Sequence, residues 1–208
     1  MEPTPFRVAV IVAHPDDETL WAGGLLLSHP EWSVVIVTLC RGQDPDRAPR
    51  FQAALKCLGA VGAMGDLDDG PEQAHLAPAM VKTTILSLLV RQDFDRLLTH
   101  GPKGEYTSHH RHEEVSKAVE ELWREGVLRA PSLWQFAYED AGGGHFPEPR
   151  MDASFCFLLS EAVWKRKNHI ISDIYGFSPE SWEARVSPRT EAFDCFERTE
   201  LGDPLAPL

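Results

Sequence analysis

The 208-residue sequence has no long hydrophobic run and no cluster of basic residues. A membrane-spanning helix needs about 20 consecutive apolar residues, and no segment approaches that length. The stretch Met1–Pro5 also lacks the basic start of a secretory signal, so we expect a soluble, cytoplasmic protein without a membrane span. The formal net charge of −12 would repel a phosphate backbone, which argues against nucleic acid and anionic membrane surfaces as partners.

Paired cysteines are also absent. The four cysteines are widely spaced and form no Cys-x-x-Cys pair; they stand at Cys40, Cys57, Cys156 and Cys195. Because structural zinc sites and redox motifs use closely spaced pairs, we expect these thiols to be reduced and to serve as small apolar packing residues.

Three common catalytic motifs are missing as well. No Gly-x-Gly-x-x-Gly follows the first apolar run, and no Gly-x-x-x-x-Gly-Lys-Ser/Thr loop occurs anywhere in the chain. A Gly-x-Ser-x-Gly turn is likewise absent. The sequence therefore lacks the usual means of binding dinucleotides or triphosphates, and the usual nucleophilic serine.

Short apolar runs do alternate with segments of helical periodicity. Strands are predicted at residues 6–12, 32–39, 61–64, 94–99, 133–138 and 155–159. Helices are predicted from about 17 to 29, and at 47–58, 77–90, 109–125 and 160–175. This alternation predicts a single α/β domain over residues 1–208 with a doubly wound, mainly parallel sheet, and leaves a tail at 176–208 unassigned.

Polar residues follow two of the predicted strands at the point where each strand ends. The segment His14–Glu18 follows the first strand, and the segment His100–His112 follows the fourth. Ligands of doubly wound sheets bind beyond the carboxyl ends of the strands. We therefore expect both segments to contribute to one site at that edge.

The residue types in these two segments suit a divalent metal. His14 and Asp17 offer an imidazole nitrogen and a carboxylate oxygen three residues apart, and His112 is the leading third ligand. Three protein ligands leave a position for water, which is the pattern of a catalytic zinc site. We expect Zn²⁺, and another divalent metal would suit the same ligands.

Two further residues are candidates for proton transfer and charge stabilisation. Asp16 lies beside the ligand Asp17 and is the candidate general base. His109 precedes His112 by about one helical turn, so a protonated His109 could stabilise an oxyanion, whereas His110 points about 100° away.

Each of these residues also has an ordinary structural interpretation. Asp16 or Asp17 could simply cap a helix, and a single histidine near a helix start is usually solvated. The acidic loop 66–70 could cap a helix or face a sugar. Candidate substrate contacts come from residues beside the predicted site, each of which could equally be an ordinary loop or surface residue: Arg41, Arg47, His100 and His145.

The two polar segments together resemble a known family. Ala13–Glu18, and Thr99–Tyr106 leading to His109-x-x-His112, resemble the LmbE-like, or PIG-L, zinc-dependent N-acetylglucosaminyl deacetylases. Weaker similarity extends from about Arg7 to Tyr175, so the resemblance implies a Rossmann-like three-layer fold with a core at about 7–175. The resemblance implies a zinc ion held at the positions already assigned to the metal, a general base at Asp16, and oxyanion stabilisation or proton delivery by His109.

The resemblance also supplies the substrate and the activity. It implies removal of an acetyl group from an N-acetylated amino sugar, often conjugated to a lipid, a thiol precursor or an antibiotic. The alternatives are an amidase that acts on another glucosamine conjugate and a non-catalytic sugar- or metal-binding member of the fold. The partner is thus expected to be a small molecule, and the sequence leaves the oligomeric state open, including a homo-oligomer.

One position departs from the family pattern. Family members commonly carry an acidic residue directly before the second histidine, where this chain has Arg111. That acid is thought to orient the first histidine, here His109. Glu105 or Glu113 could take its place, and Glu105 is in addition a candidate substrate contact.

Overall fold

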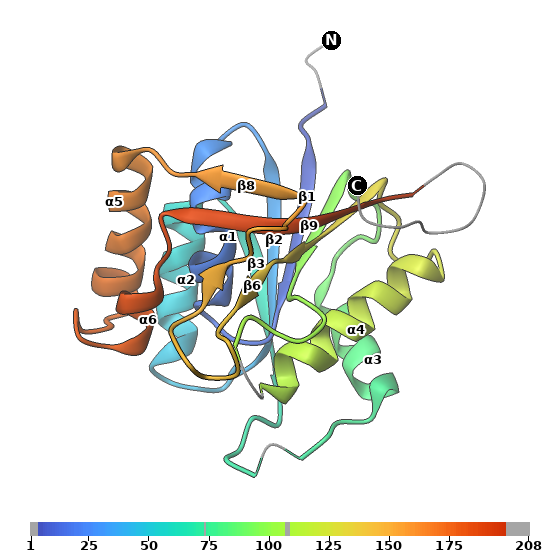
Figure 1. The fold of residues 1–208 in the computed structure, drawn as a ribbon. Coiled ribbons are helices and arrows are strands. Elements are labelled where there is room, and N and C mark those ends of the chain that lie inside the picture. The colour runs from blue at the N-terminus through green and yellow to red at the C-terminus, as the bar shows by residue number, and fades with distance from the viewer. Residues whose placement is uncertain (1–3, 73, 107–108, 199–208) are drawn as a thin grey trace.

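A computed structural model describes residues 4–72, 74–106 and 109–198. A seven-stranded sheet, ordered β3-β2-β1-β4-β5-β9-β8, runs through the centre (Figure 1). Its strands are β1 (Arg7–Val12), β2 (Ser33–Cys40), β3 (Val61–Leu67), β4 (Arg96–Thr99), β5 (Ser132–Phe136), β8 (Phe155–Leu158) and β9 (Thr190–Glu197). A separate antiparallel pair is formed by β6 (Tyr138–Glu139) and β7 (Glu148–Pro149).

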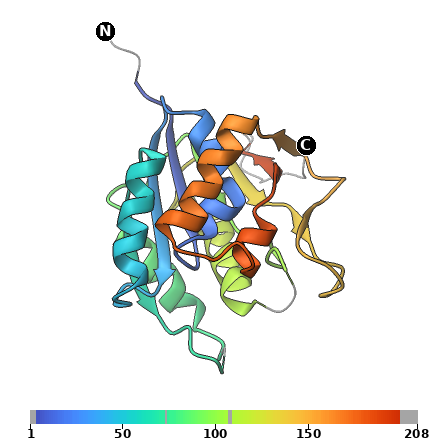
Figure 2. The same cartoon turned by 90° about the vertical axis from the view of Figure 1, so that its left-hand side faces the viewer.

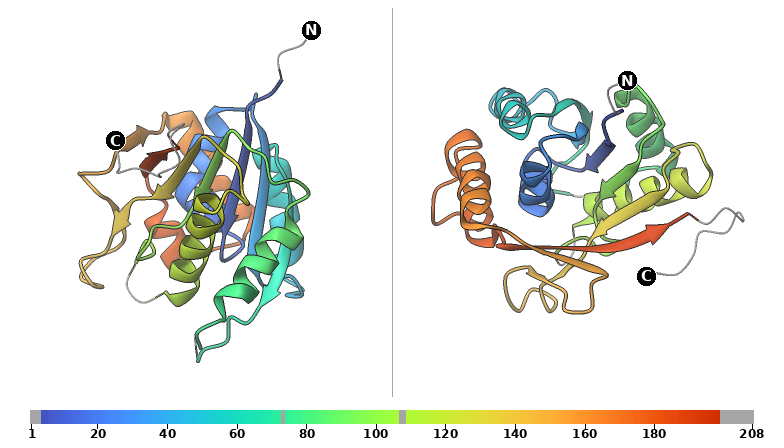
Figure 3. Two further views of the ribbon diagram at one scale, coloured as in Figure 1. Left: turned by 90° about the vertical axis from the view of Figure 1, so that its right-hand side faces the viewer. Right: turned by 90° about the horizontal axis from the view of Figure 1, so that it is seen from above.

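Helices cover both faces of the sheet, which gives three layers. One face carries α1 (Asp17–Ser28), α2 (Arg47–Leu58) and α5 (Glu161–His169), followed by the π-helical turn η1 (Ile170–Ile174) and α6 (Trp182–Val186) (Figure 2). The opposite face carries α3 (Pro78–Leu88) and α4 (His110–Arg124) (Figure 3). None of the helices in the described part of the chain combines the length and the apolar character needed to cross a bilayer.

The central strand β1 is almost continuously apolar because both of its faces are buried. Val8, Val10 and Val12 pack into the core beneath α1 and α2, whereas Ala9 and Ile11 pack into the core beneath α3 and α4. A strand covered on both faces has no polar side, so alternation is lost. The mainly parallel α/β sheet predicted from the sequence is confirmed.

The strand order places the two polar segments next to each other. From β1 the chain winds outward through β2 to β3, then returns to place β4 against the other edge of β1. Because β1 and β4 are parallel neighbours, the loops after them leave the same edge of the sheet. This is the switch point at which doubly wound folds bind ligands.

The carboxyl-terminal region differs from the prediction. The unassigned tail contains α6 and β9, and β9 is inserted antiparallel between β5 and β8. The helix predicted to reach residue 175 ends its α-helical part at His169 and continues as η1. The predicted α2, closed by Gly59 in the left-handed conformation, is confirmed, and the predicted cap Ser108 lies outside the described residues.

Candidate metal and active site

A strained turn joins β1 to α1 and positions the first half of the site. Asp16 has a φ of 120°, which is costly for a residue with a side chain. Its N–H donates to Oε2 of Glu18 at 3.0 Å. The other Glu18 oxygen, Oε1, accepts the hydroxyls of Thr19 at 2.6 Å and Tyr175 at 2.7 Å. Glu18 is therefore a buried brace, a side chain whose hydrogen bonds stabilise the turn. Its partner Tyr175 lies at the end of the π-helical turn η1.

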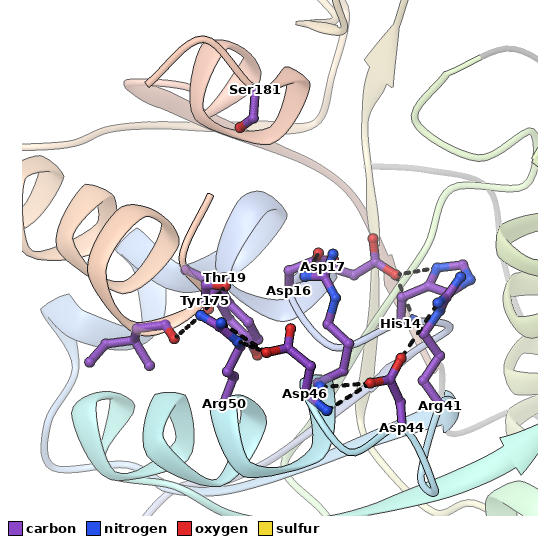
Figure 4. Close-up of polar contacts among 12 residues, drawn as sticks. His14, Asp16, Asp17, Thr19, Arg41, Asp44, Asp46, Arg50, Tyr175 and Ser181 are labelled. Atoms are coloured by element: carbon purple, nitrogen blue, oxygen red, sulfur yellow. Dashed lines mark hydrogen bonds and ion pairs between the residues drawn. The ribbon is translucent and has the colours of Figure 1, made fainter. Parts of the chain in front are cut away.

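The three predicted metal ligands meet at this edge. His14 Nδ1 lies 3.2 Å from Asp17 Oδ2 and 3.3 Å from His112 Nε2, and the last two atoms are 3.4 Å apart. Ligands at about 2.0–2.2 Å in a zinc tetrahedron lie about 3.3–3.5 Å from one another. The donor atoms therefore fit one zinc-sized divalent ion. Figure 4 shows the Asp17 carboxylate and the His14 imidazole turned toward each other.

Glu105 sets the orientation of His112. Its Oε2 accepts Nδ1–H of His112 at 2.6 Å and Nδ1–H of His100 at 2.8 Å, and its Oε1 accepts the N–H of Gly101. Burial opposes ionisation of this carboxyl, but His100 and His112 outweigh it and lower its pKa to about 2. With the proton of His112 fixed on Nδ1, its Nε2 presents a lone pair to the metal position.

His100 and Glu105 are therefore placed differently from the substrate contacts suggested by the sequence. Both side chains are fully buried beneath the pocket. The N–H of Ala13 donates to Nε2 of His100 at 2.9 Å, so both ring nitrogens of His100 have protein partners. Neither residue lines the pocket that contains Asp16; both lie against the candidate ligand His112, and Glu105 also lines a separate pocket beside Tyr106.

Asp16 lies beside the ligand set and lines the pocket. Burial, together with the charges of Asp17 and Glu18, raises its pKa well above the usual value of a carboxyl group. Its Oδ2 is 3.5 Å from Arg47 Nη1, a long contact that only partly offsets these effects. A carboxylate with raised proton affinity is suited to accept a proton.

His109 lies against both metal-site histidines. Its ring centroid is 4.1 Å from that of His112 and 4.8 Å from that of His14. Burial and these neighbouring imidazoles lower the pKa of His109 to about 3, so the ring is neutral, in contrast to the protonated ring expected from the sequence. Its Nδ1 is buried and has no hydrogen-bond partner within the described residues.

His14, Asp16, Asp17 and His109 line a pocket of about 200 Å³. Arg41 and Arg47 both line it, as the sequence suggested. Arg41, held at a φ of 65°, donates from Nη2 to Asp69 Oδ2 at 2.8 Å, and the guanidinium of Arg47 lies 4.5 Å from the ring centre of Phe177. The two cations are thus fixed at the pocket wall.

Arg111 and His145 do not enter the pocket. Arg111 is buried and points into the loop between β3 and α3, where it donates to the carbonyl oxygens of Asp68 and Ala74 and to the carboxylate of Glu114. It is therefore directed away from His109. His145 is exposed and its Nδ1 donates to the carbonyl of the adjacent Phe146.

Several residues that line the pocket were not predicted from the sequence. Asp69 belongs to the acidic loop 66–70 noted in the sequence, and Tyr106 lies inside the second motif, so both carried a local signal. Trp182 and Glu183 come from α6, in the tail that had no recognisable pattern. These two reach the site only through tertiary packing.

Comparison with known proteins assigns the family. Residues 9–123, more than half of the chain, match the PIG-L family, described as GlcNAc-PI de-N-acetylase, and the chain belongs to this family. The match supports an enzyme of the LmbE deacetylase type. A curated relative, "Uncharacterized protein L374" of Acanthamoeba polyphaga mimivirus, is 24% identical over 144 residues, which is 62% of this chain and 61% of that protein.

Solved structures share the fold at low sequence identity. N,N'-diacetylchitobiose deacetylase from Pyrococcus horikoshii is 15% identical with a TM-score of 0.65, over 91% of this chain and 83% of that one. A zinc-inhibited form of teicoplanin deacetylase Orf2 is 17% identical with a TM-score of 0.61, over 86% and 90%. GalB, the 4-carboxy-2-hydroxymuconate hydratase from Pseudomonas putida KT2440, is 18% identical with a TM-score of 0.63, over 97% and 100%.

Proposed function

We propose that this protein is a metal-dependent N-deacetylase that removes the acetyl group from an N-acetylglucosamine-type amino sugar or conjugate. Zinc, or another divalent metal, would be held by His14, Asp17 and His112. The observation that carries the proposal is the triangle of their donor atoms, with edges of 3.2, 3.3 and 3.4 Å, directly beside the raised-pKa carboxyl of Asp16. Membership of the PIG-L family supports the reaction class.

The reaction adds water across an amide and yields acetate and a free amine. A divalent metal, when bound, acts as a Lewis acid that makes water more acidic and polarises a carbonyl. Asp16 accepts the proton of the attacking water and returns it to the departing nitrogen, so one carboxylate serves as base and then as acid. Its burial supports both roles because it raises the affinity of the carboxylate for a proton.

His109 supplies a hydrogen bond as the carbonyl oxygen gains negative charge. A neutral imidazole with its proton on the unpartnered Nδ1 is a donor that needs no net charge. A neutral donor also avoids placing a further cation beside a bound metal ion. Arg111 does not interfere, since its guanidinium is engaged in the loop between β3 and α3.

Arg41 and Asp69 are suited to a hydroxyl-rich ligand. They face the pocket as a hydrogen-bonded pair, so together they offer both donors and acceptors to sugar hydroxyls. The pocket is small, and we propose that it takes the acetylated sugar residue while the rest of a conjugate remains outside.

Two other reactions are alternatives to N-deacetylation at this site. An amidase acting on another glucosamine conjugate would use the same residues. Metal-assisted hydration is the second alternative, because the fold is shared over nearly the whole of both chains with a hydratase, as it is with deacetylases.

The test combines one substitution with a substrate panel. Asp16→Asn should lower acetate release from N-acetylglucosamine conjugates by about 10²- to 10⁴-fold, the usual contribution of a positioned base, while zinc content stays unchanged. Asp46→Asn is the matched control, since this carboxylate is exposed and contacts Arg50. Full activity of Asp16→Asn would refute the assignment of the base.

The same panel separates the alternatives. Release of another acyl group or amine would favour the amidase, and loss of ultraviolet absorbance from a conjugated unsaturated acid without acetate would favour hydration. Bound zinc with no turnover of any substrate would favour a non-catalytic binding protein.

A further inference from the structure

The imidazole of His14 faces two groups of potential ligands. Its Nδ1 faces Asp17 and His112, the set already described. Its Nε2 lies 3.1 Å from Oδ1 of Asp69, from the loop after β3, and Cys40, the last residue of β2, belongs to the same cluster. One donor atom from each of these last three residues lies within 4.8 Å of the other two, close enough for the group to hold one cation.

The Nε2 atom of His14 lies close to a carboxylate without the alignment of a standard hydrogen bond. Asp69 Oδ1 lies 3.1 Å from Nε2, yet Nε2 is buried and makes no hydrogen bond within the described residues. Two atoms at this distance that are not aligned for a hydrogen bond are placed nearly like neighbouring ligands of one ion, which lie about 3.3–3.5 Å apart in a zinc tetrahedron. The buried sulfur of Cys40 completes a mixed nitrogen, sulfur and oxygen set.

We infer that His14 Nε2, Cys40 Sγ and the Asp69 carboxylate form a second metal site for a thiophilic divalent cation such as Zn²⁺ or Cd²⁺. Thiolate is a soft ligand that selects such metals over Mg²⁺ or Ca²⁺. The site is distinct from the set on Nδ1 because it uses the opposite ring nitrogen and two residues that the first set does not use.

The two sites compete for His14. A neutral imidazole has one lone pair, located on either Nδ1 or Nε2, with the proton on the other nitrogen. When Nε2 binds a metal, the proton resides on Nδ1 and the first set loses a ligand. A metal ion in the second site therefore inhibits the enzyme; this consequence rests on the proposed function, whereas the binding itself does not.

The second site should fill only when metal is in excess. Binding transfers the thiol proton of Cys40 to solvent as sulfur donates its electron pair to the metal, so proton release opposes occupancy. Arg41 also occupies Asp69 Oδ2, whereas Asp69 Oδ1 faces Nε2. The first set has no thiol proton to displace, so it binds first.

Cadmium titration followed by ultraviolet absorption tests the binding directly. The measurement uses the full chain with Cys57 and Cys156, the two more accessible thiols, replaced by Ser. With one equivalent of zinc bound, Cd²⁺ added in excess should compete for His14 and produce a cadmium–thiolate charge-transfer band. Cys40→Ser in the same background should abolish the band.

Cys195→Ser is the matched control, because Cys195 is, like Cys40, a buried free cysteine. This variant should keep the band. No band in the parent, or an equal band after Cys40→Ser, would overturn the site, and loss of the band only in Cys195→Ser would relocate cadmium to β9 and overturn it as well.

Inhibition gives the second readout. Acetate release at one equivalent of zinc serves as each variant's own reference, and excess zinc should then inhibit the parent. Cys40→Ser should need a zinc concentration higher by more than about tenfold, since loss of even a residue behind a ligand costs about 10- to 100-fold in affinity. Equal inhibition of both proteins would refute the competition. A Cys40-dependent band without any turnover would instead refute the proposed function alone.

Discussion

Helix α1 carries two buried polar clusters, one at its amino end and one at its middle, and they differ in how fully their polar atoms are satisfied. At the amino end, His14 Nε2 and the neighbouring His109 Nδ1 are buried without hydrogen-bond partners within the described residues. At the middle, Lys167 and Glu191 are both fully buried and form an ion pair at 2.7 Å.

Every polar hydrogen of the middle cluster has an acceptor. Lys167 Nζ donates to Glu191 Oε1 and to the carbonyl oxygens of Leu20 and Pro188. Glu191 accepts the backbone N–H groups of Gly24 at Oε1 and Leu25 at Oε2. The pair thus fastens the middle of α1 to α5 and β9.

The difference separates a structural cluster from a functional one. A buried charge pair with complete hydrogen bonding leaves nothing for a ligand to satisfy. Unpartnered buried nitrogens beside a pocket retain that capacity. The same helix is therefore anchored at its middle and carries the candidate site at its amino end.

The largest predicted effect falls on the middle cluster. Lys167→Met should lower the free energy of unfolding by about 3–5 kcal/mol, because Glu191 is left as an unpaired buried charge. Chemical denaturation measures it. Lys165→Met, on the same helix but with its side chain 70% exposed, is the control and should change little. Equal stability of the two variants would contradict the anchoring role.

Metal binding to the cluster at the amino end of α1 should stabilise the protein. Zinc at 100 times its dissociation constant should raise the free energy of unfolding by about 2.7 kcal/mol, since it binds the folded chain alone. Thermal unfolding with zinc and with a chelator measures the difference. His112→Gln should remove most of it, and an undiminished shift in that variant would place the metal elsewhere.

Glu105 shares features of both clusters. It is buried and its oxygens accept hydrogen bonds, as in the middle cluster, but one of its partners is the candidate metal ligand His112. Glu105→Gln should weaken zinc binding by about 10- to 100-fold, because the amide holds the Nδ1 protons of His100 and His112 less strongly than the carboxylate does. Competition with a chromophoric chelator measures it. Glu113→Gln, in the first turn of α4, provides the control. A zinc affinity of Glu105→Gln equal to that of Glu113→Gln would exclude the orienting role.

Tyr175 should give the smallest effect. Tyr175→Phe removes one hydroxyl donor from Glu18, which retains the Thr19 hydroxyl and the Asp16 N–H. The free energy of unfolding should fall by about 1 kcal/mol, and zinc affinity should remain within about twofold. A loss of zinc binding with normal stability would instead show that the brace acts on the ligands themselves.

Sequence predicted the features that depend on neighbouring residues in the chain. The apolar run of β1, the Gly59 cap of α2 and the two polar segments after β1 and β4 are local patterns, and the fold brings the donor atoms of His14, Asp17 and His112 together as these patterns suggested. The order of the parallel strands then determines which loops lie next to each other at the edge of the sheet.

Features that depend on distant partners were not predictable. β9 contains Glu191, whose charge is tolerated in a buried strand only because Lys167 lies opposite it. Glu105 was expected to contact substrate, since sequence does not show which way a loop carboxylate points. The neutral state of His109 likewise results from burial among imidazoles that only the fold brings together.

The central claim is that one metal ion on His14, Asp17 and His112 drives amide hydrolysis. Zinc titration of the metal-free protein, with acetate release from an N-acetylglucosamine conjugate as the readout, tests it most directly. We expect no release without metal and a rise that is complete at one equivalent of zinc. Undiminished release from metal-free protein in the presence of a chelator would contradict it.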